Sequence, residues 1–153
     1  MLTFSTLLIL LPAAIMLHVT EEFLFPGGFI EWYKEFRPPK TVGVQPNYLV
    51  WINTLMIGVC TLPFYFGDTK QGVSIWYCIA AIAAINACLH MFGVFTLKKY
   101  SPGVVTGLLL YIPLFIVGSI YLLSSGSISW PKAALFLSLA IGYHIYSFIR
   151  QGS

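Results

Sequence analysis

Long apolar runs, separated by short polar segments rich in glycine and proline, dominate the chain. A helix needs about 20 mostly apolar residues to cross the hydrocarbon core of a bilayer. Five runs meet or approach that length: they cover roughly residues 3–25, 48–66, 73–97, 104–123 and 131–149. The pattern predicts an all-α, polytopic membrane helix bundle of about five transmembrane helices, with residues 1–153 forming a single transmembrane domain.

Prolines inside and between the runs modify this picture. A proline and two glycines at 26–28 end the first run. Pro63 lies near the end of the second run and Pro113 lies inside the fourth, and proline bends a helix because it lacks the backbone N–H. We therefore expect kinks at both positions. The amphipathic, aromatic segment 29–36 predicts a short helix lying along the membrane interface.

Composition supports the membrane class. Hydrophobic residues make up 58% of the chain and charged residues 8%, whereas a soluble domain carries about 25% charged residues. The net charge of +3 is scattered and forms no basic stripe, so we expect no nucleic-acid partner. The expected surroundings are a lipid bilayer.

The distribution of lysine and arginine predicts an orientation. With five spans, the first, third and final polar segments lie on the side of the C-terminus. That side holds Lys34, Arg37, Lys40, Lys98, Lys99 and Arg150, and the opposite side holds Lys70 and Lys132. Because cytoplasmic segments carry the excess of these residues, we expect an outside N-terminus and a cytoplasmic C-terminus in a bacterial-type inner or plasma membrane.

The first run ends in a cluster of ionisable residues, His18, Glu21 and Glu22. An ionisable side chain in hydrocarbon costs roughly 2.5–3.5 kcal/mol, so such residues persist mainly where they pair, face a cavity or perform chemistry. The i, i+3, i+4 spacing places all three on one helix face. This cluster is able to bind a divalent cation, or to share a proton between its two carboxylates.

The remaining histidines are predicted at a similar depth. At about 1.5 Å per residue, His90 lies ~12 Å before the lysine pair that follows its run, and His144 lies ~9 Å before the arginine that follows the last run. With His18 they converge on one layer, in the cytoplasmic leaflet. Asn86, one turn before His90, and Asn53 are expected to support this layer, although Asn53 also suits an interhelical hydrogen bond.

A purely structural interpretation of these residues stays open. A single buried histidine such as His144 usually packs and forms a hydrogen bond, and Asn86 suits that purpose for His90. Glu21 and Glu22 could mark the interfacial end of the first helix. The convergence of all three histidines of the chain on one leaflet favours a functional site over this alternative.

The residues His18-Val19-Thr20-Glu21-Glu22 spell HxxEE. Set in a small protein with several spans, this resembles the family of uncharacterised integral membrane proteins named for its HXXEE motif. The resemblance extends over most of the chain and includes a histidine in a later helix and the Tyr-x-Pro-Gly turn at 100–103. It implies a membrane protein but brings no settled activity.

A weaker similarity is to the CAAX-protease and bacteriocin-processing family, whose members use a glutamate pair and two later histidines. The glutamate pair of this chain, His90 and His144 supply these residue types in that order. Two positions depart from the pattern: Pro26 replaces an arginine, and Asn86 replaces a phenylalanine. The similarity therefore implies related chemistry and not a shared fold.

These residues predict a membrane-embedded, metal-dependent enzyme. His18, Glu22, His90 and His144 are the candidate ligands, and Glu21 or Glu22 is the candidate catalytic base. Zn²⁺ accepts such ligands and activates water, so zinc is expected over iron and hydrolysis of a lipid or other hydrophobic substrate is the simplest reaction. Fe²⁺ on two histidines and a carboxylate would instead make the protein an oxidoreductase.

Another class of function fits the same residues. Intramembrane histidines and glutamates also serve proton relays, so a small proton- or metal-coupled transporter or binding protein is an alternative, as is a structural membrane subunit. Nothing in the sequence indicates an oligomeric state, because Gly107 and Gly118 do not form a GxxxG face.

Overall fold

The computed structural model describes residues 2–37 and 46–151, and within these ranges every regular element is helical. The elements are α1 Phe4–Phe23, α2 Phe29–Phe36, α3 Pro46–Val59, α4 Leu62–Phe66, α5 Lys70–Leu97, α6 Val104–Thr106, the π-helix η1 Gly107–Tyr111, α7 Ile112–Ser124 and α8 Trp130–Gln151. The predicted all-α helix bundle is confirmed.

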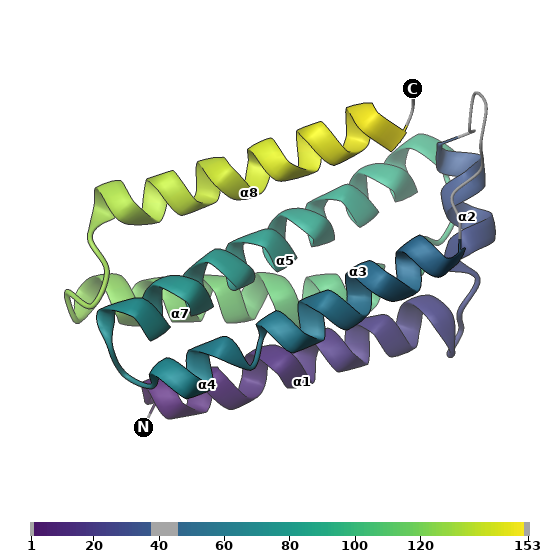
Figure 1. Cartoon of the computed structure of the whole chain (residues 1–153). Coiled ribbons are helices and arrows are strands. Elements are labelled where there is room, and N and C mark those ends of the chain that lie inside the picture. The colour runs from purple at the N-terminus through teal and green to yellow at the C-terminus, as the bar shows by residue number, and fades with distance from the viewer. Residues whose placement is uncertain (1, 38–45, 152–153) are drawn as a thin grey trace.

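Successive long helices lie beside one another and run in opposite directions (Figure 1). The α5 helix is the centre of the bundle and packs against α1, α4, α7 and α8. The C-terminal ends of α1, α5 and α8 lie at the same end of the bundle as α2, which crosses that end (Figure 1). The connectivity therefore brings three stretches that are distant in sequence to one end of the molecule.

Among the described residues, four helices are long and apolar enough to cross a membrane, and such a set indicates a membrane protein. They cover Phe4–Phe23, Lys70–Leu97, Val104–Ser124 and Trp130–Ile149. The second predicted run is interrupted, because α3 ends at Val59 and α4 begins at Leu62. Pro63 stands in the first turn of α4, where its missing N–H is tolerated, so a new helix starts there instead of one helix bending.

The fourth predicted run contains a π-helical turn instead of a simple kink. Gly107–Tyr111 is π-helical, and the N–H of Ile112 donates to the carbonyl of Gly107, five residues earlier. Pro113 stands in the first turn of α7 directly after it. Because proline supplies no N–H and crowds the preceding turn, the wider turn accommodates it.

The apolar end of the bundle is packed around Trp76 of α5, which is fully buried. Its Nε1 donates to the carbonyl of Leu7 on α1 over 2.8 Å. Gly118 of α7 lies so close that an added Cβ would stand 2.2 Å from the indole. One tryptophan thus joins α1, α5 and α7.

The short helix α2 confirms the amphipathic pattern at 29–36. It buries Phe29 and Trp32 and leaves Glu35 exposed, where Glu35 pairs with Lys99 over 2.6 Å. Trp32 reaches α5 at Gly93, whose missing Cβ would lie 2.2 Å from the indole ring. The helix is therefore fastened to the end of α5 by a buried indole and to the residue pair after α5 by an exposed ion pair. Its predicted place in a membrane interface stays a prediction.

Candidate functional site

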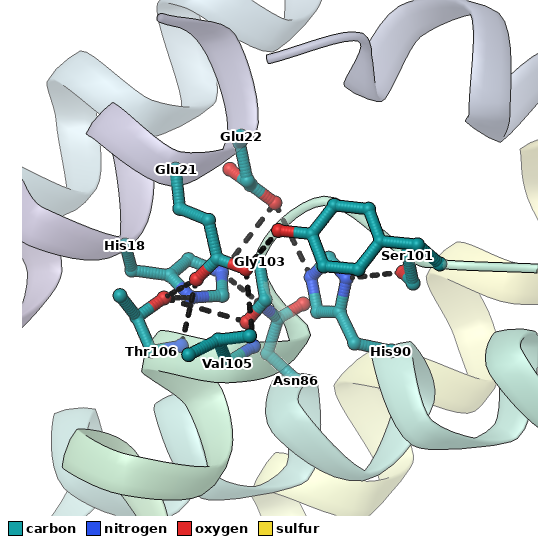
Figure 2. A network of polar contacts seen from close by, with 10 residues as sticks. His18, Glu21, Glu22, Asn86, His90, Ser101, Gly103, Val105 and Thr106 are labelled. Atoms are coloured by element: carbon teal, nitrogen blue, oxygen red, sulfur yellow. Dashed lines mark hydrogen bonds and ion pairs between the residues drawn. The ribbon is translucent and has the colours of Figure 1, made fainter. Parts of the chain in front are cut away.

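Three buried side chains converge where α1 and α5 meet (Figure 2). Glu22 Oε1 lies 3.4 Å from His18 Nε2 and 3.2 Å from His90 Nε2. One donor atom from each of the three residues lies within 4.8 Å of the others. In the part of the chain that the structure describes, they form a candidate metal-binding group of one carboxylate and two imidazoles.

Hydrogen bonds determine the tautomer of His18. Its Nδ1 lies 2.9 Å from Thr106 Oγ1. The single hydroxyl hydrogen of Thr106 is directed to an acceptor, either Glu21 Oε2 or the carbonyl of Gly103, so His18 Nδ1 must be the protonated donor in this pair. In the neutral ring, Nε2 then carries the lone pair, and it lies 3.2 Å from Asn86 Nδ2 and faces Glu22.

His90 is held from behind and from the side. Its Nδ1 lies 2.9 Å from the hydroxyl oxygen of Ser101, which is fully buried. The ring stacks on the indole of Trp32 with centroids 5.8 Å apart and planes 21° apart. Both contacts fix the direction of Nε2 towards Glu22, as expected of residues that orient a metal ligand through its second nitrogen.

Glu21 has a different environment from its neighbour. Its carboxylate accepts four hydrogen bonds: from the Tyr100 hydroxyl, from the backbone N–H groups of Val105 and Thr106, and from the Thr106 hydroxyl. Three of these donors belong to α6, so Glu21 anchors the loop and the short helix that follow α5. Its negative charge is balanced by these donors, all of which come from residues 100–106 (Figure 2).

Tyr100 stays a donor to this carboxylate at neutral pH. Partial burial of the phenol, its hydrogen bond to Glu21 and the charge of that carboxylate all raise the pKa of Tyr100. A phenol already keeps its proton at pH 7. The hydrogen bond from Tyr100 is therefore constant across the physiological range.

Gly103 forms the floor of the site. Its φ of 98° lies in the left-handed region that favours glycine. A Cβ added there would lie 2.8 Å from Cε1 of His18, 2.8 Å from Cε1 of His90 and 3.1 Å from Cγ of Glu22. Only a residue without a side chain permits the loop to approach both imidazoles this closely.

A cavity of about 160 Å³ opens beside the three residues and extends between α2, α3, α5 and α8. His18, Glu22 and His90 contribute polar atoms to its wall, as do Asn53 and Asn86, and most of the remaining wall is aromatic or aliphatic. A volume of this size exceeds many times the need of one ordered water. The cavity can therefore receive an organic ligand.

His144 lines the same cavity but lies outside the group of three. Its Nδ1 lies 2.9 Å from the backbone carbonyl of Ala140. A carbonyl only accepts, so Nδ1 of His144 is protonated and Nε2 carries the lone pair of the neutral ring. His144 as fourth ligand, and Glu21 or Glu22 as base, stay predictions.

The structure thus brings His18, Glu22, His90 and Asn86 together, and it arranges Asn53 and His144 around the adjoining cavity. Sequence reasoning missed Ser101 and Thr106. Both are small, uncharged residues that orient the histidines through hydroxyl groups. The only signal for them was their position in and beside the Tyr-x-Pro-Gly turn at 100–103.

Comparison with known proteins agrees with the motif. The chain is 26% identical over 139 residues to the uncharacterized protein YrkK of Bacillus subtilis (strain 168). The matched region covers 89% of this chain and 86% of that protein. No solved structure matches. The family model described as protein of unknown function with HXXEE motif matches residues 9–118. This range includes His18, Glu22 and His90, and it ends before α8, which carries His144. The chain belongs to the HXXEE family.

Proposed function

We propose that the protein is a metal-dependent membrane enzyme, most simply a hydrolase acting on a lipid or other hydrophobic substrate. The observation that carries the proposal is the approach of one buried carboxylate oxygen, Glu22 Oε1, to His18 Nε2 and His90 Nε2 at 3.4 and 3.2 Å. Two ligands at about 2.1 Å from a tetrahedral Zn²⁺ lie about 3.4 Å apart. The spacing of these atoms suits such an ion.

The hydrogen-bond network supports a cation at this point. Because His18 donates through Nδ1, Nε2 of its neutral ring carries the lone pair, which lies 3.4 Å from Glu22 Oε1 and 3.2 Å from the Asn86 amide nitrogen, a donor that a bound metal would displace. A lone pair and a carboxylate oxygen repel each other unless a proton or a metal ion lies between them. A divalent metal bound by His18, Glu22 and His90 would satisfy all three groups and leave a position open for substrate.

The surrounding residues have separate roles in this proposal. A divalent metal would supply Lewis acidity and activate water. Thr106 holds the His18 imidazole in the tautomer that a ligand through Nε2 needs, and Ser101 holds the His90 imidazole in the direction that a ligand needs. Glu21 holds α6 and its Thr106 in place and acts as a positioning residue. His144, with its Nε2 lone pair, is suited to serve as the fourth ligand or as a base at the cavity wall.

An iron-dependent oxidoreductase is the second candidate, and one observation favours it. The group of three contains two histidines and one carboxylate, which is the ligand set of non-haem Fe²⁺ sites. The identity of the metal in the purified protein separates the two candidates.

We further propose an outside N-terminus and a cytoplasmic C-terminus in a bacterial-type inner or plasma membrane, with the site in the cytoplasmic leaflet. The excess of lysine and arginine in the segments on the C-terminal side supports this orientation. A Lys98→Cys variant in a background without other cysteines should react only with reagent on the cytoplasmic side, and reaction from the outside would reverse the assignment.

Metal analysis of protein purified without chelator tests the main proposal. We expect a stoichiometric divalent metal in the wild type and its loss in Glu22→Gln and His90→Ala, because each change removes a ligand. Glu31→Gln is the matched control, since Glu31 is an exposed carboxylate on α2. A wild-type protein without metal, even after incubation with Zn²⁺ or Fe²⁺, would refute a metal-dependent function.

A further inference from the structure

Two buried donors on α2 and at its C-terminal end have no hydrogen-bond partner in the described part of the chain. Among the side chains that the structure describes, these atoms are Nε1 of Trp32 and one terminal guanidinium nitrogen, Nη1, of Arg37. Trp32 lies on α2 and Arg37 directly follows it. Buried N–H groups are nearly always paired with protein or ligand acceptors, so two such donors five residues apart call for an explanation.

One of these residues lines the cavity beside the candidate metal site, and the other contacts its wall. Trp32 lines the cavity and is 8% exposed. The guanidinium of Arg37 lies over the ring of Phe148, 3.5 Å from its centroid, and Phe148 lines the cavity too. Phe36 connects them, because its ring stacks on Trp32 at 5.0 Å and lies 6.2 Å from Phe148. An aromatic wall thus runs from Arg37 to Trp32 and on to His90.

The charge of Arg37 determines what kind of ligand fits. The face of Phe148 attracts the cation but accepts no conventional hydrogen bond from it. Glu35, an acidic neighbour on α2, is paired with Lys99. A guanidinium with a buried, unpaired N–H binds a carboxylate or phosphate oxygen best, because such charge-assisted hydrogen bonds are the strongest available to it.

We propose that the cavity binds an amphiphile with one apolar chain and an anionic oxygen headgroup, a carboxylate or a phosphate. Arg37 binds the headgroup, and Trp32 Nε1 donates to a second oxygen of the ligand. The chain lies along the aromatic wall, and the portion that follows the headgroup passes His90. The inference names the substrate class of the proposed enzyme and in that respect rests on the proposed function, although ligand binding itself needs no metal.

Binding of probes with equal chains and different headgroups tests this inference. Dodecanoate, dodecyl phosphate, dodecanol and dodecylamine are offered to the full chain in nonionic detergent, and retained ligand is measured by native mass spectrometry. We expect one or both anions to bind more tightly than dodecanol by about tenfold or more, which corresponds to one charge-assisted hydrogen bond. The carboxylate and phosphate arms identify which headgroup is preferred. Equal binding of anions and alcohol, or preference for the amine, would overturn the proposal.

Three variants locate the effect. Arg37→Gln should abolish the preference for anions, and Trp32→Phe, which keeps an aromatic ring but removes the N–H, should weaken anion binding by a smaller factor. Lys34→Gln is the matched control because it removes an exposed positive charge from the same helix and should keep the preference. An unchanged preference in Arg37→Gln, with helical content equal to that of the wild type by circular dichroism, would refute the assignment of the headgroup site.

A separate arm distinguishes this inference from the proposed function. Glu22→Gln removes a metal ligand but leaves Arg37 and Trp32 intact, so it should retain anion binding while losing metal. Wild-type protein that takes up no metal even after incubation with Zn²⁺ or Fe²⁺, yet prefers anionic probes, would refute the metal-dependent function and leave the binding site supported. Metal-loaded protein without headgroup preference would refute the headgroup site and leave the metal-dependent function supported.

Discussion

At one end of the bundle, Gly118 of α7 lies against the indole of Trp76, and at the other end Gly103 lies against the imidazoles of His18 and His90. In both places an absent side chain permits the segment that follows α5 to approach aromatic rings closely. The partners differ in chemistry. Trp76 itself makes one hydrogen bond, to a backbone carbonyl, whereas the His90 end contains two buried carboxylates and two buried imidazoles in contact with Gly103 or its neighbours.

A glycine packed against aromatic rings therefore serves stability at one end of the bundle and the candidate site at the other. Around Trp76, close packing holds three helices together, and its loss should reduce stability. Around Gly103, the close approach of the loop places hydroxyl and backbone N–H groups against the histidines and Glu21. Its loss should reduce metal binding. The two ends can therefore be separated by measuring the free energy of unfolding and the metal content on the same variants.

The largest effect on stability is expected from Trp76→Ala. Removing a fully buried aromatic side chain leaves a cavity and should lower the free energy of unfolding by about 3–5 kcal/mol, measured by denaturant titration in detergent micelles with circular dichroism. Trp51→Ala is the control, because Trp51 is 74% exposed and its removal should change little. If the folded fraction of Trp76→Ala also loses its metal, the separation of the two ends is wrong.

A Gly103→Ala substitution should have an intermediate effect on stability and a much greater effect on metal content than Trp76→Ala. The positive φ costs about 1–3 kcal/mol for a residue with a side chain, and the new methyl group would displace both imidazoles. Gly126→Ala offers a sharp control, since Gly126 also has a positive φ, 71°, but an added Cβ meets nothing within 4 Å. Equal metal contents in the two variants would contradict the role of Gly103 as floor of the site.

The smallest effect is expected from Tyr100→Phe. The change removes one of four hydrogen bonds to Glu21 and should cost about 1 kcal/mol of unfolding free energy, with a modest loss of metal affinity because Thr106 becomes less firmly held. Tyr65→Phe, at a residue that is 86% exposed, controls for loss of a phenol. Metal affinity reduced as far as in Glu22→Gln would mean that Tyr100 itself contributes to binding.

Much of the bundle was predictable because its signals are local. Apolar runs of membrane-spanning length predicted the helices, and i, i+3, i+4 spacing predicted the shared face of His18, Glu21 and Glu22. Depth counted from polar loops predicted that His90 and His144 lie in one layer. His90 does contact Glu22, whereas His144 lines the neighbouring cavity, since counting residues gives depth along a helix but not the direction in which it faces.

The contrast between Glu21 and Glu22 was not predictable. Adjacent glutamates in one motif are chemically identical, and their environments depend on a loop some 80 residues later in the chain. The hydroxyls of Ser101 and Thr106 carry no charge and follow no periodic pattern, so nothing marked them as partners of histidines. The break between α3 and α4 depended on one proline whose effect, bending or ending a helix, is decided by tertiary packing.

The π-helical turn at Gly107–Tyr111 has a consequence for how insertions and deletions would act. Its extra residue shifts the rotational phase of everything beyond it by about 100° relative to an unbroken α-helix. The residues before the turn and those after it therefore face different directions around the helix axis. Before the turn, Thr106 faces the HxxEE residues of α1, and after it, Gly118 faces Trp76. Deleting a single residue in this turn would remove the difference in direction, so that the chain could keep one of these two contacts only by losing the other.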